Sequence, residues 1–455
     1  MTDKNTEHSE ADKKIVRHKR RVRSQIIAYV SFVILVAGVA IGGIYGVNTL
    51  GTKFYEMKVA KQEEAESIAA SEAEAESADE EIPLVEETVS EEEESVPETT
   101  EYTEEELLEE VVNSCIEDMP LEDKVAGLFI VTPESLTGVD KAVKAGDGTK
   151  EALEKYPVGG IIYFAQNIQS ESQIKEMVDN TVSYSKYPLF IAVDEEGGRI
   201  ARLQSSLKLE ATDSPQVLAE AGDDNAVYDT YSLIGERLAS YGFNLDFAPV
   251  ADVLTNEANK VIGDRSFGSD TEVVIKNVTL AVQGLRAQGI SACVKHFPGQ
   301  GSVGGDTHEG MASTDRSAED MKNTDIPPFT SGIAAGADMV MVGHFICPSL
   351  TEDDTTPCSL SKAVMTDLLR GECGYNGVII TDALSMTAIS EYHSSDEAAV
   401  KALKAGADML LMPEDFEAAY NGVLEAVKDG TIDEQRINDS LARVYRVKYR
   451  STVEN

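Results

Sequence analysis

Ionisable side chains gather at the end of one apolar run, in types that could bind a ligand or transfer protons. The run, residues 291–297, predicts a buried strand that a Pro-Gly pair ends. Lys295 and His296 lie at its end, and Asp306 and His308 follow in a glycine-rich segment. Charged groups are costly to desolvate at such a position, so they indicate a ligand-binding or catalytic site rather than packing. A satisfied ion pair at the strand end is the alternative interpretation.

Asp382 supplies a further carboxylate, because it ends the apolar run 378–381. A carboxylate at this place could attack an anomeric carbon, as in retaining glycoside hydrolysis. An acid must then face it. Asp306 and His308 could form a pair in which the carboxylate favours the protonated imidazole and orients its ring. The imidazolium could protonate the leaving oxygen and, as imidazole, later deprotonate water.

Three of the six histidines, His296, His308 and His344, lie in or after strand-like runs, whereas the others lie in tails or loops. Such clustering is compatible with a zinc site. However, the first predicted strand ends without a ligand and no His-x-His pair occurs, so we expect neither a metal nor a cofactor. If His308 is not the acid, Glu195 and Glu309 are the next candidates.

Eight short apolar runs alternate with stretches of helical spacing. The runs are residues 127–132, 158–164, 189–195, 243–252, 291–297, 339–345, 377–384 and 408–413. Runs this apolar predict burial on both faces, and eight alternations are typical of a single (β/α)8 barrel of the TIM type. An open doubly wound sheet is the alternative. The segment 433–450 predicts a last helix with its apolar side on the barrel.

The N-terminal part predicts a membrane anchor. Residues 24–52 contain no charged residue, and the mostly apolar stretch 26–47 could cross about 30 Å of hydrocarbon as a helix. A cleavable signal peptide is the alternative, but its apolar region would be about 7–15 residues long. Basic residues precede the span, so we expect the N-terminus in the cytoplasm and the barrel outside. The predicted parts are a basic cytoplasmic tail (1–25), a transmembrane helix (26–50), an acidic disordered linker (51–113) and the barrel (114–450).

The acidic linker carries much of the net charge of −42, since residues 62–110 contain 22 acidic residues and no basic one. This tract is too charged and too poor in aromatic residues to collapse. Because an acidic protein repels phosphates, we expect no nucleic-acid partner. The five cysteines are too few for a disulfide framework, although Cys347 and Cys358 could pair in an oxidising compartment.

Four linked motifs resemble the β-N-acetylglucosaminidase branch of glycoside hydrolase family 3. They are VDEEGGR (193–199), IGDRSFG (262–268), KHFPGQG (295–301) with DTH (306–308), and GVIITDALSM (377–386). The resemblance covers roughly residues 114–450 and implies a (β/α)8 barrel, with Asp382 as the nucleophile and Asp306 and His308 as the acid/base. It also implies four residues that bind N-acetylglucosamine: Asp194, Arg265, Lys295 and His296.

The sequence departs from the family pattern in two ways. Gln300 stands where the motif usually has a second histidine, which bears on the geometry of the loop and on substrate preference. We expect no counterpart of the additional C-terminal domain that some family members have, which favours the Asp-His acid and a hexosaminidase.

We therefore expect a monomeric, membrane-anchored exo-β-N-acetylglucosaminidase on the outer side of the membrane. Its expected substrates are amino-sugar glycans such as peptidoglycan fragments. A wall-binding barrel without turnover and a phosphorylase, in which phosphate replaces water, are the alternatives. Assay with a chromogenic N-acetylglucosaminide separates the first alternative from hydrolysis, and detection of a sugar phosphate separates the second.

Overall fold

The computed structural model describes residues 103–453 apart from 308 and 352. The predicted tail, the predicted membrane span at 26–50 and most of the acidic linker lie outside the described residues. Among the helices of the described part, none combines the length and the apolarity needed to cross a bilayer.

Eight parallel strands form one sheet in the order β10-β1-β2-β3-β6-β7-β8-β9. They are β1 (Phe129–Val131), β2 (Gly160–Ile162), β3 (Phe190–Val193), β6 (Leu245–Asp246), β7 (Ser291–Phe297), β8 (Met339–Val342), β9 (Val378–Thr381) and β10 (Leu410–Leu411). A parallel bridge between Ile380 and Met409 joins β9 to the start of β10, so the sheet closes on itself. Each of the eight predicted runs contains one strand, which confirms a parallel α/β barrel and excludes the open sheet.

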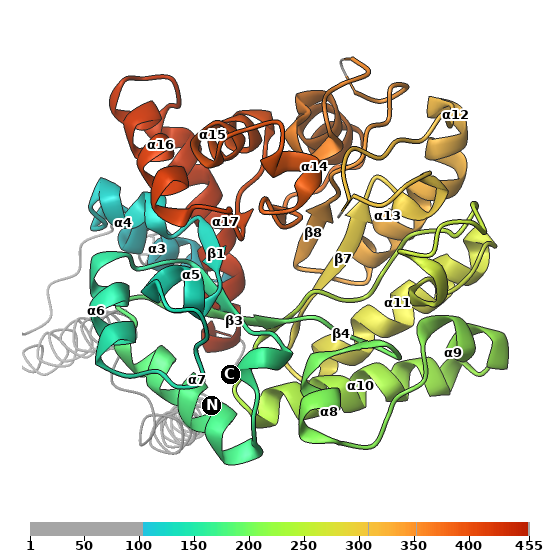
Figure 1. Ribbon diagram of the computed structural model, residues 1–455, viewed down its shortest axis with the longest axis horizontal. Coiled ribbons are helices and arrows are strands. Elements are labelled where there is room, and N and C mark those ends of the chain that lie inside the picture. Colours follow the sequence, from blue (N-terminus) through green and yellow to red (C-terminus); the bar gives the residue numbers. More distant parts are fainter. Residues whose placement is uncertain (1–102, 308, 352, 454–455) are drawn as a thin grey trace, which may run out of the picture. The chain divides into compact units, whose positions relative to one another are not determined.

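Helices surround these strands (Figure 1). The longer ones are α3 (Glu104–Glu117), α6 (Asp147–Lys155), α7 (Glu171–Tyr184), α10 (Asp224–Ser240), α11 (Thr271–Ala287), α13 (Pro327–Ala334), α15 (Ser395–Ala405), α16 (Phe416–Lys428) and α17 (Glu434–Val453), with a π-helix at Ala363–Glu372. The shorter ones are α4 (Leu121–Ala126), α5 (Pro133–Thr137), α8 (Arg202–Leu207), α9 (Pro215–Ala221), α12 (Ala318–Asp320) and α14 (Thr387–Ser390). Side-chain caps fix several starting points; the Asp270 carboxylate, for example, accepts from the first backbone N–H groups of α11.

Helix α3 corrects the predicted start of the barrel domain. The charge of residues 51–113 predicts a disordered linker, but the helix begins at Glu104. Thr103 and Glu106 form a capping box, in which each side chain accepts from the other residue's backbone N–H. The apolar face of α3 is buried and packs against α17. The prediction of disorder is therefore wrong for residues 104–113, because an apolar face every third or fourth residue outweighs the local acidic charge.

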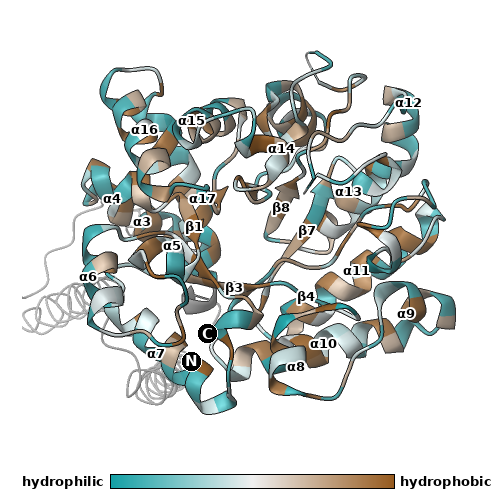
Figure 2. Cartoon of the chain, in the orientation of Figure 1, coloured by the Kyte–Doolittle hydropathy of each residue, from teal (hydrophilic) through white to brown (hydrophobic). Residues whose placement is uncertain are grey.

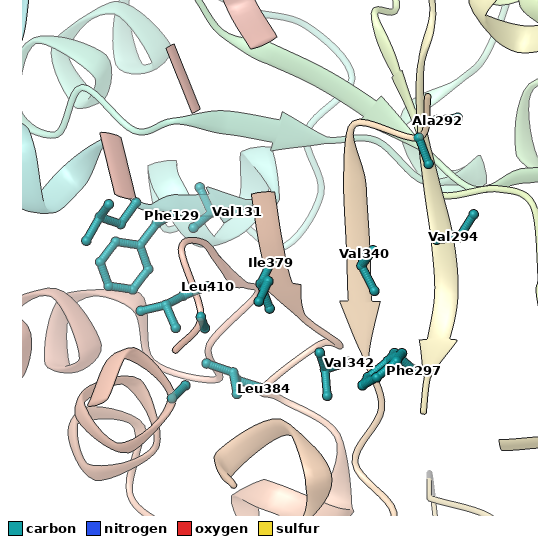
Figure 3. Packing of buried hydrophobic residues seen from close by; sticks show 14 of the residues in the cluster. Phe129, Val131, Ala292, Val294, Phe297, Val340, Val342, Ile379, Leu384 and Leu410 are labelled. Atoms are coloured by element: carbon teal, nitrogen blue, oxygen red, sulfur yellow. The ribbon is translucent and has the colours of Figure 1, made fainter. Parts of the chain in front are cut away.

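Alternate residues of each strand enter two separate cores. Ile130, for example, belongs to a small cluster inside the barrel, whereas its neighbours Phe129 and Val131 belong to the large cluster between strands and helices. Figure 3 shows members of the large cluster on neighbouring strands, with Val342 beside Phe297, its partner in the strand register. In Figure 2, β8 is coloured hydrophobic while much of α6 is hydrophilic. Both faces of the sheet are thus apolar, as a closed parallel barrel requires.

Helix α17 closes the end of the barrel where the strands begin. Its Val444 belongs to the cluster inside the barrel, and Lys448 Nζ donates to the carbonyl of Gly159, just before β2. The Asp408 carboxylate, buried just before β10, accepts from Ser440 Oγ of α17 at 2.8 Å and from Ile379 N of β9 at 2.9 Å. The same carboxylate contacts the guanidinium groups of Arg370 and Arg443.

Asp408→Ala should lower the free energy of unfolding by about 3 to 5 kcal/mol, because the guanidinium groups of Arg370, Arg436 and Arg443 lose a buried partner. The measurement is chemical denaturation followed by circular dichroism. Asp367→Ala is the matched control, since it removes an ion pair with Lys362 in which both side chains are about 60% exposed, and it should cost at most about 0.5 kcal/mol. Equal effects of the two substitutions would show that the Asp408 cluster does not hold the barrel end together.

Candidate active site

A cavity of about 580 Å³ lies at the end of the barrel where the strands finish. Six of the seven predicted site residues line it: Asp194, Arg265, Lys295, His296, Asp306 and Asp382. The seventh, His308, lies outside the described residues. The barrel thus gathers residues separated by almost two hundred positions in the sequence around one space, as the ends of its strands converge.

A buried ion cluster forms one side of this cavity. Lys295 Nζ lies 2.7 Å from Asp194 Oδ1 and 2.7 Å from Glu196 Oε1. Arg265 forms a bidentate pair with the Glu196 carboxylate, with distances of 2.7 and 2.8 Å. Although burial opposes ionisation of Glu196, Arg265 and Lys295 hold the pKa of its carboxyl well below its usual range. Glu196 therefore stays charged, and Asp194, Arg265 and Lys295 line the cavity beside it.

The hairpin of β4 (Glu195–Gly197) and β5 (Ile200–Ala201) places the carboxylates of this cluster. Its turn needs Gly198, which has φ of +56° and whose added Cβ would lie 2.7 Å from Ser214 Cβ. The hairpin turns Glu195 away from the cavity, because its carboxylate accepts from Leu203 N and Gln204 N at the start of α8. Burial raises the pKa of Glu195 to about 7, but the residue caps a helix and does not line the cavity. It is therefore not placed to serve as the alternative acid.

His296 is fixed by Asp252. The imidazole Nδ1 lies 2.8 Å from Asp252 Oδ2. An ionised carboxylate is an acceptor only, so Nδ1 carries the hydrogen of this bond. The other ring nitrogen, Nε2, is then available to a ligand. Asp252 Oδ1 also accepts from Gln300 N at 2.6 Å. One buried carboxylate thus orients the ring and holds the start of the glycine-rich loop.

Asp382 follows β9 and stands as a carboxylate in the cavity. Its Oδ1 accepts from Ala383 N at 2.7 Å. Burial opposes its ionisation, but the nearby imidazoles of His344 and His296 and the Ala383 amide hold the pKa of Asp382 below its usual value. His344 Nε2 donates to the carbonyl of Ala383 at 2.9 Å and its Nδ1 accepts from Ser359 Oγ, so it steadies the turn that carries Asp382.

The loop with Asp306 forms another side of the cavity. Asp306 and Thr307 line it, and the carbonyl of Thr307 accepts from Ala388 N of α14 at 3.2 Å. Gln300 is buried, and its Nε2 lies 3.4 Å from Thr307 Oγ1, so the residue that departs from the family motif supports this loop. Glu309 is exposed and does not line the cavity.

Sequence reasoning missed Arg202. This residue lines the cavity, its guanidinium lies 5.9 Å from the ring of Phe164, and its Nε is buried without a hydrogen-bond partner among the described residues. A buried unpaired donor in a cavity is suited to bind a ligand oxygen. The one available signal in the sequence was that Arg202 lies three residues after Arg199, the last residue of the 193–199 motif. Arg199 itself donates to Asp264 and to the backbone carbonyl of Val261.

A larger cavity of about 820 Å³ lies at the opposite end of the barrel, between α3, α17 and the loops that precede β8 and β9. Its arginines are already paired; Arg450, for example, contacts both oxygens of Asp338. The residues predicted to bind a ligand or to catalyse a reaction therefore lie in the smaller cavity, not in this one.

Comparisons with known proteins identify related sequences and structures. The family model described as "Glycosyl hydrolase family 3 N terminal domain" matches residues 120–447. β-Hexosaminidase A of Pseudoalteromonas piscicida is 33% identical over 324 residues, which are 66% of this chain and 54% of that protein. The β-hexosaminidase LpqI of Mycobacterium tuberculosis is 34% identical over 338 residues, 72% of this chain and 82% of that protein. A family 3 β-N-acetylglucosaminidase structure from Paenibacillus sp. has a TM-score of 0.69 and 35% identity, and covers 74% of this chain and 64% of that one. The chain thus spans about half the length of the Pseudoalteromonas relative.

Proposed function

The chain belongs to glycoside hydrolase family 3, and from this premise we propose that it is a retaining exo-β-N-acetylglucosaminidase. The observation that carries the proposal is the carboxylate of Asp382, kept ionised at the end of β9 and facing a cluster of fixed cations and carboxylates. The β-hexosaminidase relatives support the choice of an amino sugar. We propose terminal N-acetylglucosamine of peptidoglycan fragments or related glycosides as the substrate, and a monomer as the working form.

The ion cluster supports recognition of the terminal sugar. Lys295 and Arg265 can donate to sugar hydroxyls, and the Asp194 carboxylate can accept from them. His296 Nε2 offers one more polar contact, and Arg202 has an unused buried donor. Asp194, Arg265, Lys295 and His296 are already held by neighbouring charged groups, so little side-chain ordering is left for the moment of binding.

Catalysis in this proposal proceeds in two displacements. The Asp382 carboxylate attacks the anomeric carbon while the bond to the aglycone oxygen breaks, and a proton from the loop acid passes to that oxygen. The product is a glycosyl ester of Asp382. The acid, now deprotonated, removes a proton from water as the water attacks the anomeric carbon, which breaks the ester and restores both groups.

His308, oriented by Asp306, is the proposed acid and base. Support comes from the position of Asp306 in the wall of the cavity and from the absence of Glu195 and Glu309 from that wall. The glycine-rich segment that carries them has Gly305 at φ of +106°, a conformation that side chains disfavour. Such a segment can adjust as the substrate binds and as the product leaves.

Asp382→Ala should lower turnover of 4-nitrophenyl N-acetyl-β-D-glucosaminide by at least about 10⁴-fold, because Asp194 is held by Lys295 and Asp306 lies on the loop, so neither takes the place of the attacking carboxylate. A slow substrate should leave a glycosyl adduct on Asp382 that mass spectrometry of peptides locates. Asp367→Ala, an exposed carboxylate on the outer π-helix, should keep full activity. An adduct elsewhere, or formation of a sugar phosphate in place of free sugar, would contradict the proposed reaction.

His308→Ala should lose about 10²- to 10⁴-fold in kcat/KM on glycosides with sugar leaving groups, and about tenfold or less on aryl glycosides with acidic phenols. The reason is that an acidic phenol leaves without protonation. Asp306→Ala should show a milder form of the same pattern. If both substrate types lost equal activity, His308 would bind the sugar instead of donating a proton.

We also propose that the barrel works outside the cell, held by the membrane span predicted at residues 26–50. The support is the uncharged apolar stretch with basic residues before it. An extracytoplasmic barrel at the end of an acidic segment would reach wall material, which fits peptidoglycan as the source of substrate.

Protease added to intact protoplasts should remove the barrel and spare residues 1–50. Antibodies against each part, used on blots before and after lysis, measure this directly. A cytoplasmic marker enzyme serves as the control for sealed cells. Protection of the barrel until lysis would reverse the proposed orientation.

A further inference from the structure

Two adjoining cavities lie beside the active-site loop and have no role in the reaction derived above. Their volumes are about 620 and 540 Å³, and both are lined by Thr356, Leu360 and Lys401. The first extends to Met311 of the loop and to Tyr392, and the second runs along α15 to Lys404. Because they share these three residues, the two cavities adjoin each other, and we call them together the α15 hollow.

The loop stands between the α15 hollow and the active-site cavity. Asp306 and Thr307 line the active-site cavity, whereas Met311 lines the α15 hollow. Helix α14 repeats this division: Met386, which precedes it, lines the active-site cavity, and Tyr392, which follows it, lines the hollow. The two spaces therefore flank the contact at which the carbonyl of Thr307 accepts from α14.

The α15 hollow carries positive charge in an otherwise acidic protein. Lys401 and Lys404 are exposed, and within the described part of the chain neither forms an ion pair. Lys401 Nζ donates instead to His393 Nδ1 at 3.1 Å. Burial and the nearby Lys401 lower the pKa of His393, so the imidazole positions the ammonium group without neutralising it. Asp354 and Glu397 also line the hollow, but neither lies within ion-pair distance of these lysines.

We propose that the α15 hollow binds the peptide-bearing aglycone of a peptidoglycan fragment, with Lys401 and Lys404 facing carboxylates of the peptide. The inference rests on the proposed function, in which an acid on the loop must reach the glycosidic oxygen. The terminal sugar then occupies the cavity on one side of the loop, and the aglycone begins at the loop itself. The hollow extends along α15 as far as Lys404, so it offers room for a chain beyond the first unit of the aglycone.

Tyr392 adds an apolar contact to this charge complementarity. Tyr392 is 52% exposed and lines the hollow, so its ring is accessible to a ligand there. Its ring can pack against a sugar face or an apolar peptide side chain while its hydroxyl stays in water. Asp353 stabilises the opposite edge, because its carboxylate accepts from the backbone and hydroxyl groups of Thr355 and Thr356.

The test compares kcat/KM for N-acetylglucosaminyl-muramyl peptide with free peptide carboxylates and for the same compound with those carboxylates amidated. The full-length enzyme should prefer the free acid by about three- to tenfold at low ionic strength, because each exposed lysine contributes a modest charge interaction. The preference should shrink as salt is added. The double variant Lys401→Gln/Lys404→Gln should reduce the ratio to about one.

Lys428→Gln is the matched control, since Lys428 is an exposed lysine that pairs with Glu122 on the side of α16 and α4. It should leave the ratio unchanged. A ratio of about one in the unmodified enzyme, or a ratio that the double variant preserves, would overturn the proposal. If the disaccharide without peptide shows the same preference for a free carboxylate, the muramyl acid and not the peptide is recognised, and the assignment fails. Lack of turnover of the 4-nitrophenyl glycoside would instead disprove the proposed function.

Discussion

The buried carboxylate of Glu196 is the interaction on which the shape of the cavity depends. It accepts from Arg265 and from Lys295, so it joins the β4–β5 hairpin, the loop before α11 and strand β7. Removing such ions from water costs several kcal/mol each, and the cost is offset only when the partners are close and well aligned. The hairpin, the loop before α11 and strand β7 must therefore be correctly placed relative to one another before the three charges can pair. The charges that face a ligand and the backbone that supports them are set by the same contacts.

The two sides of the cavity differ in how firmly they are held. Asp382, Lys295 and His296 stand at the ends of strands, and each has a short hydrogen bond to a neighbouring group. The loop side depends on weaker links, among them the 3.4 Å contact between Gln300 and Thr307. The proposed double displacement has matching needs, since the attacking carboxylate and the sugar must be fixed while the proton donor serves two different oxygens in turn.

The sequence allowed the barrel to be predicted because each strand is buried on both faces and so forms an uninterrupted apolar run. Prediction from the sequence failed where the local charge suggests one structure and the apolar spacing another. Helix α3 lies in an acidic tract, and its apolar face is visible only at helical spacing. Adjacent acids in the motif at 193–199 take different roles, since Glu195 caps α8 while Glu196 pairs with Arg265. The hairpin turn decides between them, and no property of a glutamate by itself reveals which way it faces. Arg202 was missed for the same reason.

The chain enters the barrel domain at the end opposite the candidate active site. Helix α3 starts beside the loops that precede β8 and β9, where Glu105 and Glu109 contact Arg446 of α17, and the catalytic cavity opens at the other end of the strands. A force applied to the chain at residue 103 would therefore act first on α3 and α17, which pack against each other. The β4–β5 hairpin, the loop and the end of β9 lie at the other end of the strands and would stay unloaded.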